Sequence, residues 1–224
     1  MAMVGSITGQ VYERLRDDLA HCVLPPGQRL RTNLLSGRFG VSLSVVREAL
    51  TRLAAEGLVV ADPRRGFSAA SISTADLRSL TEAATGLASL CLPASIRAGD
   101  ASWEQALGQS WDVVQRTTLI EHGQLSEAFA VAHAGFETAL MSACPNPWLL
   151  RLRDTLAVQT QRYHRICVAL AAVEPDPRPL LHDILVAALA RDTNNAVTLI
   201  ERSFTANLGR FLDVLERHPD LIPS

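Results

Sequence analysis

The sequence predicts a mainly α-helical protein in which an N-terminal winged helix-turn-helix is followed by an all-helical bundle. Apolar residues recur at helical spacing along most of the 224 residues. Two short helical patterns flank a glycine turn at Gly40, and a strand–turn–strand pattern follows the second of them. We place the domain boundary in the linker behind this pattern, so the expected domains are 1–72 and 73–224.

The segment GVSLSVVREALTRLAAEG, residues 40–57, contains the second helical pattern. Ser42 is a suitable N-cap for a helix over 43–56, and the glycine that follows stands where helices commonly end. A short helix over 33–39, with Thr32 as its predicted cap, precedes the glycine turn. Two short helices joined by a tight turn form a helix-turn-helix unit, whose second helix can enter a DNA major groove.

A β-hairpin is predicted directly after the second helix. Strands over 58–61 and 67–70 flank a turn that contains proline, arginine and glycine. A hairpin in this position is the wing of a winged helix-turn-helix, and its tip carries Arg64, Arg65 and Gly66. Arginines at such a tip can reach phosphates or a minor groove, and the glycine lets the backbone come close to DNA.

Most of the other elements in the prediction are helices. One opens the chain over 9–24, and Ser73 is the expected N-cap of the first helix after the linker, which Pro93 is expected to end. Ser102 with Gln105 resembles a capping box at the start of the next helix. The helices of the second domain are expected near 75–91, 103–121, 125–143, 147–172, 178–191 and 194–217. A helical bundle of roughly 150 residues is a normal size for one domain.

Charge is distributed unevenly along the chain. Residues 1–70 hold nine arginines against six acidic residues, a net of +3, whereas the remainder holds twelve against seventeen, a net of −5. A basic part joined to an acidic part suits a DNA-contacting module on an effector module, although ordinary surface variation gives similar differences. No apolar run is long enough to span a bilayer and no signal peptide opens the chain, so we expect a cytoplasmic protein without membrane contact.

Several motifs, in order, resemble the GntR family of bacterial transcription regulators. They are VYERLRDDL (11–19), LPPGQRL (24–30), FGVS…VREAL…EGLV (39–59) and PRRGFSAA (63–70). The helical remainder resembles the FCD ligand-binding domain in its six-helix, VanR-like version. The signature residues of that domain are present as Phe136, Leu140, Ala143, Asn146, Pro147 and Leu149. The resemblance implies a homodimer that binds a near-palindromic operator in double-stranded DNA and takes a small-molecule effector such as an organic acid.

The residues expected to contact DNA lie on the helix-turn-helix and the wing. They are Arg31, Ser42, Leu43, Ser44, Arg47, Arg64, Arg65 and Gly66. Leu43 departs from the family pattern, which commonly has an arginine in this place. An arginine reads guanine edges bidentately, whereas leucine can contact a thymine methyl, so the usual operator sequence of the family is in question here. The alternative for Arg47 is a solvated helix face or an intrahelical pair with Glu48.

The resemblance also implies a pocket in which many FCD domains hold a divalent metal with an Asp and a His one turn apart and two later His. The first pair falls on His133 and Glu137, with the residue types exchanged but one helix face still shared. The third position falls on Leu181 or, with a one-residue gap, on His182, and the fourth falls on Ser203.

Two forms of this pocket follow from these residues. In one, His133, Glu137 and His182 hold zinc, nickel or manganese, and water or an organic ligand completes the shell. In the other, the pocket is metal-free, and the first two side chains hydrogen-bond to each other or to the ligand. The other candidates to line the pocket are Ser203, Asn207, Arg162 and Tyr163. His164 is interpreted as a satisfied core residue.

These features favour a transcription regulator, which we expect to be a repressor whose operator affinity changes when an effector binds in the helical domain. One alternative is a ligand-blind or architectural DNA-binding protein with a degenerate pocket. Another is a metal-dependent enzyme built on His133 and Glu137. The enzyme is disfavoured because the sequence offers no third strong ligand, no nucleophile motif and no phosphate loop.

Overall fold

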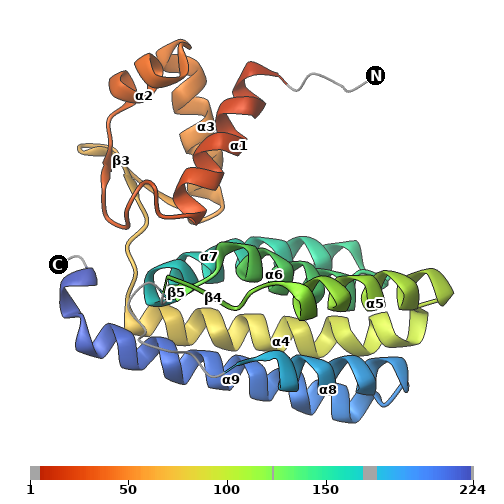
Figure 1. Cartoon of the computed structure of the whole chain (residues 1–224). Helices are drawn as coiled ribbons and strands as arrows, with labels where there is room; N and C mark the ends of the chain where they lie inside the picture. The colour runs from red at the N-terminus through yellow and green to blue at the C-terminus, as the bar shows by residue number, and fades with distance from the viewer. Residues whose placement is uncertain (1–5, 123, 169–175, 223–224) are drawn as a thin grey trace.

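The computed structural model describes residues 6–122, 124–168 and 176–222. Within these ranges the chain has the predicted mainly helical fold, with a small N-terminal unit lying above a layered set of long helices (Figure 1). We call residues 6–70 the head and the described residues from 74 onward the bundle. A short linker connects the two.

The head is a winged helix-turn-helix around its own apolar core, which includes Leu15, Leu19, Leu50 and Leu53. Its elements are α1 (Ile7–Ala20), β1 (Arg29–Leu30), α2 (Thr32–Phe39), α3 (Leu43–Ala55), β2 (Val59–Asp62) and β3 (Gly66–Ala69). The strands form one antiparallel sheet in the order β1-β3-β2. Strands β2 and β3 are therefore the predicted wing, and β1 adds a third strand beside it.

Two glycines in the left-handed conformation follow the two helices of the helix-turn-helix. Gly40 follows α2 with a φ of 64°, and Gly57 follows α3 with a φ of 75°. The backbone N–H of Leu58 then donates to the carbonyl of Leu53 at 3.0 Å and closes the end of α3. Glycine adopts this backbone conformation without steric cost, so α3 ends where the sequence predicted.

The bundle contains six α-helices within the described ranges. They are α4 (Thr74–Ala98), α5 (Ala101–Arg116), α6 (Glu127–Met141), α7 (Pro147–Val168), α8 (Arg178–Leu189) and α9 (Thr193–Arg217), and a 3₁₀ turn η1 (Pro219–Leu221) follows them. Helix α4 is central and contacts α6, α7 and α9 (Figure 1). The main bundle core includes Leu92, Phe136, Leu140, Ile184 and Ile200.

Helices α4 and α7 run antiparallel. At one end, the backbone N–H of Ser73 donates to the hydroxyl of Tyr163 at 3.1 Å. At the other end, the N–H of Ala143, just before α7, donates to Oγ of Ser95 at 3.1 Å. The start of α7 therefore lies beside the last turns of α4, and its end lies beneath the linker.

Helix α4 continues through Pro93, where the sequence predicted its end. A proline inside a helix removes one backbone hydrogen bond and costs about 3 kcal/mol. Cys91, Leu92 and Ile96 are fully buried on either side of it. Packing of these side chains outweighs the local cost, so the expectation from the proline alone was wrong.

Two of the predicted caps were also wrong. Asp100 caps α5, because its Oδ1 accepts from the N–H of Trp103 at 3.0 Å. The hydroxyl of Ser102 donates to the same carboxylate at 2.6 Å, so it is not the cap. Arg31 occupies the N-cap position of α2 without a side-chain bond, and Thr32 is the first helical residue.

A short hairpin of β4 (Ile120–Glu121) and β5 (Gln124–Leu125) stands where the sequence predicted the end of the second bundle helix. Residues 169–172, the predicted end of the fourth bundle helix, lie outside the described ranges. Among the helices that the structure describes, none combines the length and the hydropathy needed to cross a membrane.

Candidate nucleic-acid interface and interior polar cluster

All eight residues predicted to contact DNA are exposed. Ser42, Leu43 and Ser44 form the start of α3, and the side chain of Leu43 is 50% exposed. Ser42 occupies the N-cap position, but its Oγ lies 2.9 Å from Oγ of Ser44 and makes no capping bond. The first backbone N–H groups of α3 therefore lack a cap from this side chain and can bind a DNA phosphate.

Arg47 connects the recognition helix with the wing. It lies on the exposed face of α3, and the guanidinium carbon is 5.9 Å from the ring centroid of Phe67 on β3. A cation over an aromatic face is held by the ring quadrupole. Helix α3 and the wing are therefore presented as one surface rather than as two independent elements.

The wing tip is closed by the carboxylate of Asp62. The N–H groups of Arg64 and Arg65 donate to Oδ1 of Asp62 at 2.7 and 3.0 Å, and these bonds hold the pKa of that carboxyl below its usual value. Gly66 completes the turn with a φ of 83°. Because only the backbone N–H groups of the two arginines bond to Asp62, both arginine side chains remain exposed and available for phosphates or a minor groove.

Other arginines of the head stabilise the fold instead. Arg38 forms an ion pair with Asp18 at 2.8 Å, and the guanidinium of Arg52 lies 4.1 Å from the ring centroid of Tyr12. Within the described part of the chain, none of the arginines predicted to contact DNA forms an ion pair. Arg38 is therefore paired with a carboxylate within the head, whereas the arginines predicted to contact DNA are not.

Polar side chains from three helices come together inside the bundle, and we call this group the interior cluster. Its members are His133 and Glu137 on α6, His164 on α7, and Asn207 and Arg210 on α9. Nε2 of His133 is buried and lies 3.6 Å from Oε1 of Glu137. The guanidinium of Arg210 donates to Oδ1 of Asn207.

His164 connects α7 to this cluster. Burial, and then the charges of His133 and Arg210, lower its pKa to about 4, so the imidazole is neutral at pH 7. Its ring packs edge-on against Phe211, with the centroids 5.8 Å apart. The histidine is half-buried, and it lies among polar groups rather than in the purely apolar core that the sequence suggested.

Arg210 is a cluster residue that the sequence reasoning missed. Ser203, Asn207 and Arg210 stand at i, i+4 and i+7 on α9, which puts them on one face of the helix. Ser203 is 8% exposed and is therefore buried on that face. The helical spacing from Ser203 was the signal that could have identified the arginine.

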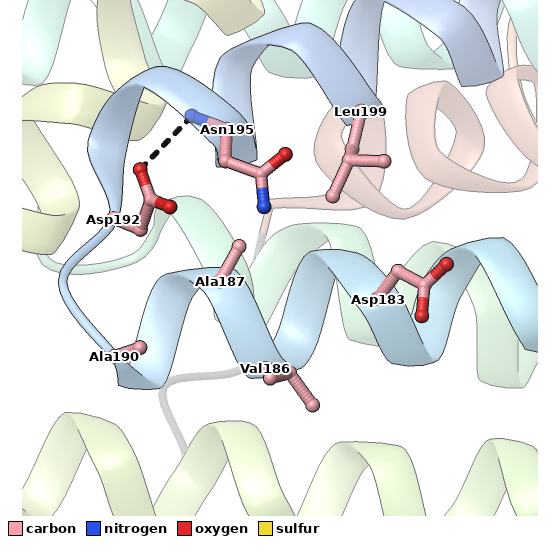
Figure 2. A pocket seen from close by; sticks show the side chains of 7 residues that line it. All are labelled: Asp183, Val186, Ala187, Ala190, Asp192, Asn195 and Leu199. Atoms are coloured by element: carbon pink, nitrogen blue, oxygen red, sulfur yellow. Dashed lines mark hydrogen bonds between the residues drawn. The ribbon is translucent and has the colours of Figure 1, made fainter.

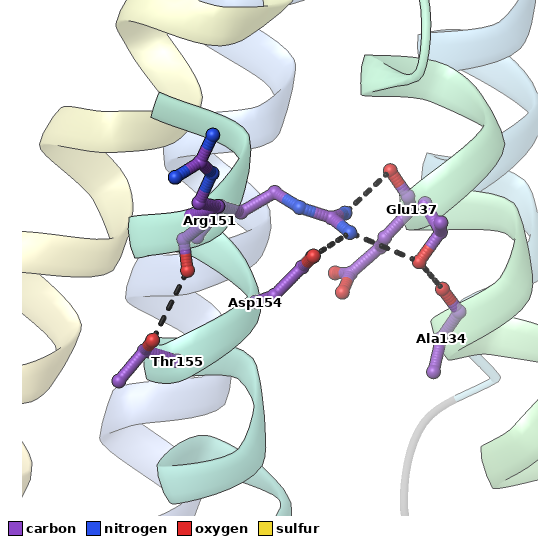
Figure 3. Close-up of polar contacts among 7 residues, drawn as sticks. Ala134, Glu137, Arg151, Asp154 and Thr155 are labelled. Atoms are coloured by element: carbon purple, nitrogen blue, oxygen red, sulfur yellow. Dashed lines mark hydrogen bonds and ion pairs between the residues drawn. The ribbon is translucent and has the colours of Figure 1, made fainter. Parts of the chain in front are cut away.

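Helices α6 and α7 are tied together beside Glu137. The guanidinium of Arg153 donates to the carbonyl of Glu137 at 3.3 Å and to the hydroxyl of Thr138 at 3.2 Å, and it also pairs with Asp154 at 2.6 Å (Figure 3). The carboxylate of Glu137 is not the acceptor in these bonds. It therefore remains beside His133 and part of the cluster.

His182, the third candidate metal ligand, is not grouped with His133 and Glu137. His182 is exposed on α8, with its ring centroid 5.4 Å from that of Trp111, and Leu181 is buried in the core. In the ranges that the structure describes, no three His, Cys, Asp or Glu side chains are grouped so as to hold an ion. His133 and Glu137 supply two donors, whereas protein zinc sites use three or four.

A surface pocket of about 340 Å³ lies elsewhere, between α8 and α9 (Figure 2). Its lining residues are Asp183, Val186, Ala187, Ala190, Asp192, Asn195 and Leu199. No residue predicted from the sequence to bind a ligand is among them. The side chains of Arg162 and Tyr163 instead contact Ala70 at the end of the head and Ser73 in the linker.

Comparisons with known proteins agree with this division. The family model described as "Bacterial regulatory proteins, gntR family" matches residues 7–68, and the FCD domain model matches residues 79–206. An uncharacterized HTH-type transcriptional regulator, BphR of Paraburkholderia xenovorans, is 31% identical over 215 residues, which cover 93% of this chain and 86% of the relative. The HTH-type transcriptional repressor GlaR of Escherichia coli is 27% identical over 202 residues, which cover 85% of this chain and 89% of the relative.

Solved structures share the fold at lower identity. E. coli McbR/YncC superimposes with a TM-score of 0.77 at 21% identity, and the match covers 94% of this chain and 99% of the McbR/YncC chain. A putative transcriptional regulator from Rhodococcus sp. RHA1 gives the same TM-score at 20% identity, with 93% and 99% covered.

Proposed function

The chain belongs to the GntR family of bacterial regulatory proteins and carries an FCD domain, and on this basis we propose a cytoplasmic repressor that responds to a small organic anion. The curated relatives that cover most of the chain are HTH-type transcriptional regulators rather than enzymes. The exposed start of α3 and the wing tip would contact the operator. The interior cluster would bind the effector.

The observation that supports an anionic effector is the charge of the interior cluster. Arg210 is a permanent cation, His164 is a neutral imidazole, and Asn207 offers an amide. Glu137, the carboxylate of the cluster, lies beside His133. A guanidinium and an amide on the same helix face offer donors that match the planar oxygens of a carboxylate. We therefore propose a carboxylate-bearing metabolite as the effector class.

The metal-free form of the pocket is the one we propose. A zinc, nickel or manganese ion at His133 and Glu137 would need most of its ligands from water or the effector. The third family position falls on buried Leu181 or exposed His182, and the fourth falls on Ser203. Arg210 supplies positive charge to the cluster without a metal. Elemental analysis of the purified protein tests this directly, since one bound ion per chain would contradict it.

A homodimer is part of the proposal, and the exposed side of α4 and α7 is the face that we assign to it. Leu90, Trp148 and Leu152 are 60%, 67% and 52% exposed. The antiparallel packing of α4 and α7 brings the start of α7 beside the last turns of α4, which places these side chains on neighbouring stretches. A two-fold axis through such a face would pair the patch with itself and present two heads to one operator.

The test combines DNA binding with ligand binding. Fluorescence anisotropy measures affinity for fragments upstream of the protein's own gene at low and moderate salt. Thermal unfolding is followed with a panel of two- to six-carbon mono- and dicarboxylates, with the matching alcohols as neutral controls. A carboxylate at 100 times its Kd stabilises the folded protein by about 2.7 kcal/mol. The same compound should change operator affinity.

Two variants assign the effect to the cluster. Arg210→Met should abolish the carboxylate response and leave operator affinity without ligand unchanged, whereas Arg202→Met, an exposed arginine on the same helix, should preserve both. Operator binding that no carboxylate alters would contradict the effector and leave a ligand-blind DNA-binding protein. Failure to bind any upstream fragment at low salt would contradict the assignment of the DNA-contacting residues.

A further inference from the structure

One stretch of α7, residues 159–165, contacts both the head and the interior cluster. Its side chains at Gln159 and Arg162 reach the head, whereas His164 belongs to the cluster. Arg165 forms an ion pair with Glu127 at 2.8 Å, and the other partner of this carboxylate, 3.9 Å away, is His21 at the end of α1.

Arg162 is the most buried of the charged groups at this junction. It is 2% exposed, and burial lowers the pKa of its guanidinium. The guanidinium donates to the carbonyl of Ala70, where the head meets the linker, and to Oε1 of Gln159 at 2.8 Å. Both acceptors are neutral, so neither bond is a salt bridge, and desolvation is the largest effect on the guanidinium. Such a contact holds the head in one orientation without an ion pair.

Gln159 connects α7 to the recognition helix α3. Its amide nitrogen donates to the carbonyl of Glu56 at 2.9 Å. Glu56 is the C-cap residue of α3, whose other end carries the DNA-facing residues. In addition, the thiol of Cys22 donates to the backbone carbonyl of Arg162 at 3.7 Å. Three separate parts of the head are therefore held by a single turn of α7.

We infer that Arg162 is the positioning residue that fixes the direction of the recognition helix relative to the bundle. With Arg162 in place, the two heads of a dimer stand at one separation and one angle and fit one spacing of operator half-sites. His164 lies only two residues further on the same helix, so an occupant of the interior cluster that moves α7 also moves the groups holding the head. The inference rests on the proposed function, because half-site spacing has meaning only for an operator-binding dimer.

The experiment measures how strictly the protein reads half-site spacing. Full-length wild type, Arg162→Ala, Arg162→Lys and the control Arg202→Ala are titrated with the native operator and with operators carrying about five extra central base pairs, which turn one half-site by about half a helical turn. Wild type and Arg202→Ala should lose at least tenfold in affinity on the altered operator. Arg162→Ala should differ by less than threefold between the two operators, and Arg162→Lys should fall between them.

Hydrogen exchange of the DNA-free protein gives a second readout. In Arg162→Ala, amides of residues 70–73 should exchange at least tenfold faster than in wild type, and in Arg202→Ala they should be unchanged. If Arg162→Ala does not fold, Gln159→Ala is measured in the same way and must move in the same direction.

The outcomes separate this inference from the proposed function. Wild-type spacing discrimination and wild-type exchange in Arg162→Ala would overturn the role of Arg162. If the wild type itself binds no operator, the proposed function fails, and the exchange of residues 70–73 alone decides whether Arg162 holds the head.

Discussion

The hydroxyl of Tyr163 donates to Oδ2 of Asp76 at 2.6 Å and joins the end of α7 to the first turn of α4. The hydroxyl oxygen of Tyr163 also accepts from the backbone N–H of Ser73, the N-cap residue of α4. Burial and the bond to Asp76 raise the pKa of Tyr163, so it stays protonated and keeps donating. The linker between head and bundle therefore ends at a fixed point.

Tyr163→Phe should lower the free energy of unfolding by about 1 kcal/mol, because the N–H of Ser73 and the carboxylate of Asp76 each lose a partner. Urea denaturation at pH 7 measures the change. Thr198→Ala removes an exposed hydroxyl that bonds only to its own helix and should stay within about 0.5 kcal/mol of wild type. Equal stability of Tyr163→Phe and wild type would show that these bonds contribute nothing net.

Arg47→Ala should weaken operator binding by about 1–3 kcal/mol if its guanidinium reads a base edge. Competition with unrelated DNA of the same length distinguishes lost base recognition from a lost phosphate contact, because the first reduces discrimination and the second does not. Arg116→Ala, an exposed arginine of the bundle, is the matched control. An unchanged specificity ratio would restrict Arg47 to the phosphate backbone.

His164 should make the protein less stable in mild acid. Its pKa is lowered to about 4 in the folded state, against about 6.5 for an exposed histidine. The unfolded chain therefore takes up a proton first, and stability is lost as the pH falls from about 6.5 to about 4, by up to about 3 kcal/mol. His164→Gln should flatten this part of the stability profile in denaturation at successive pH values. A profile identical to that of wild type would show that another group causes the acid sensitivity.

Local chemistry explains why the head could be predicted from the sequence. Left-handed glycines and alternating apolar residues act within a few positions of one another, and Gly40 and Gly57 stand where the pattern required them. The error at Pro93 has the opposite cause. Packing from three neighbouring helices stabilises α4 there, and no short stretch of sequence contains that information.

The interior cluster was harder to predict because it depends on how helices are placed in space. His133 and Glu137 were found from their spacing within one helix, and the structure keeps them adjacent. Arg210 and His164 come from other helices, and only the tertiary fold shows that they lie close to each other. In the same way, the sequence could not show that Arg162 contacts the head at Ala70, although His164, two residues further along, belongs to the cluster.

Gly99→Ala should destabilise the protein by about 1–3 kcal/mol. An added Cβ would collide with the indole ring of Trp103. That ring cannot move easily, because its Nε1 donates to the carbonyl of Ala139 at 3.0 Å and the guanidinium of Arg191 covers its face.

Gly108→Ala is the contrasting change. Its Cβ would meet nothing within 4 Å, so the better helix propensity of alanine should raise stability by roughly 0.5–1 kcal/mol. Thermal denaturation of both variants measures the difference, and equal effects would contradict the crowding at Gly99.

Leu90→Arg should convert the proposed dimer into monomers. The substitution places a charge in an apolar patch that would face its own copy across a two-fold axis, so like charges would meet in the interface. Light scattering after size exclusion measures the mass. Val186→Arg, an equally drastic change at a side chain that is 51% exposed on α8, is the control that should leave the mass unchanged. Because a monomer presents one head, Leu90→Arg should also bind a full operator no more tightly than a single half-site. A dimer that survives Leu90→Arg but dissociates with Val186→Arg would move the interface from α4 and α7 to α8.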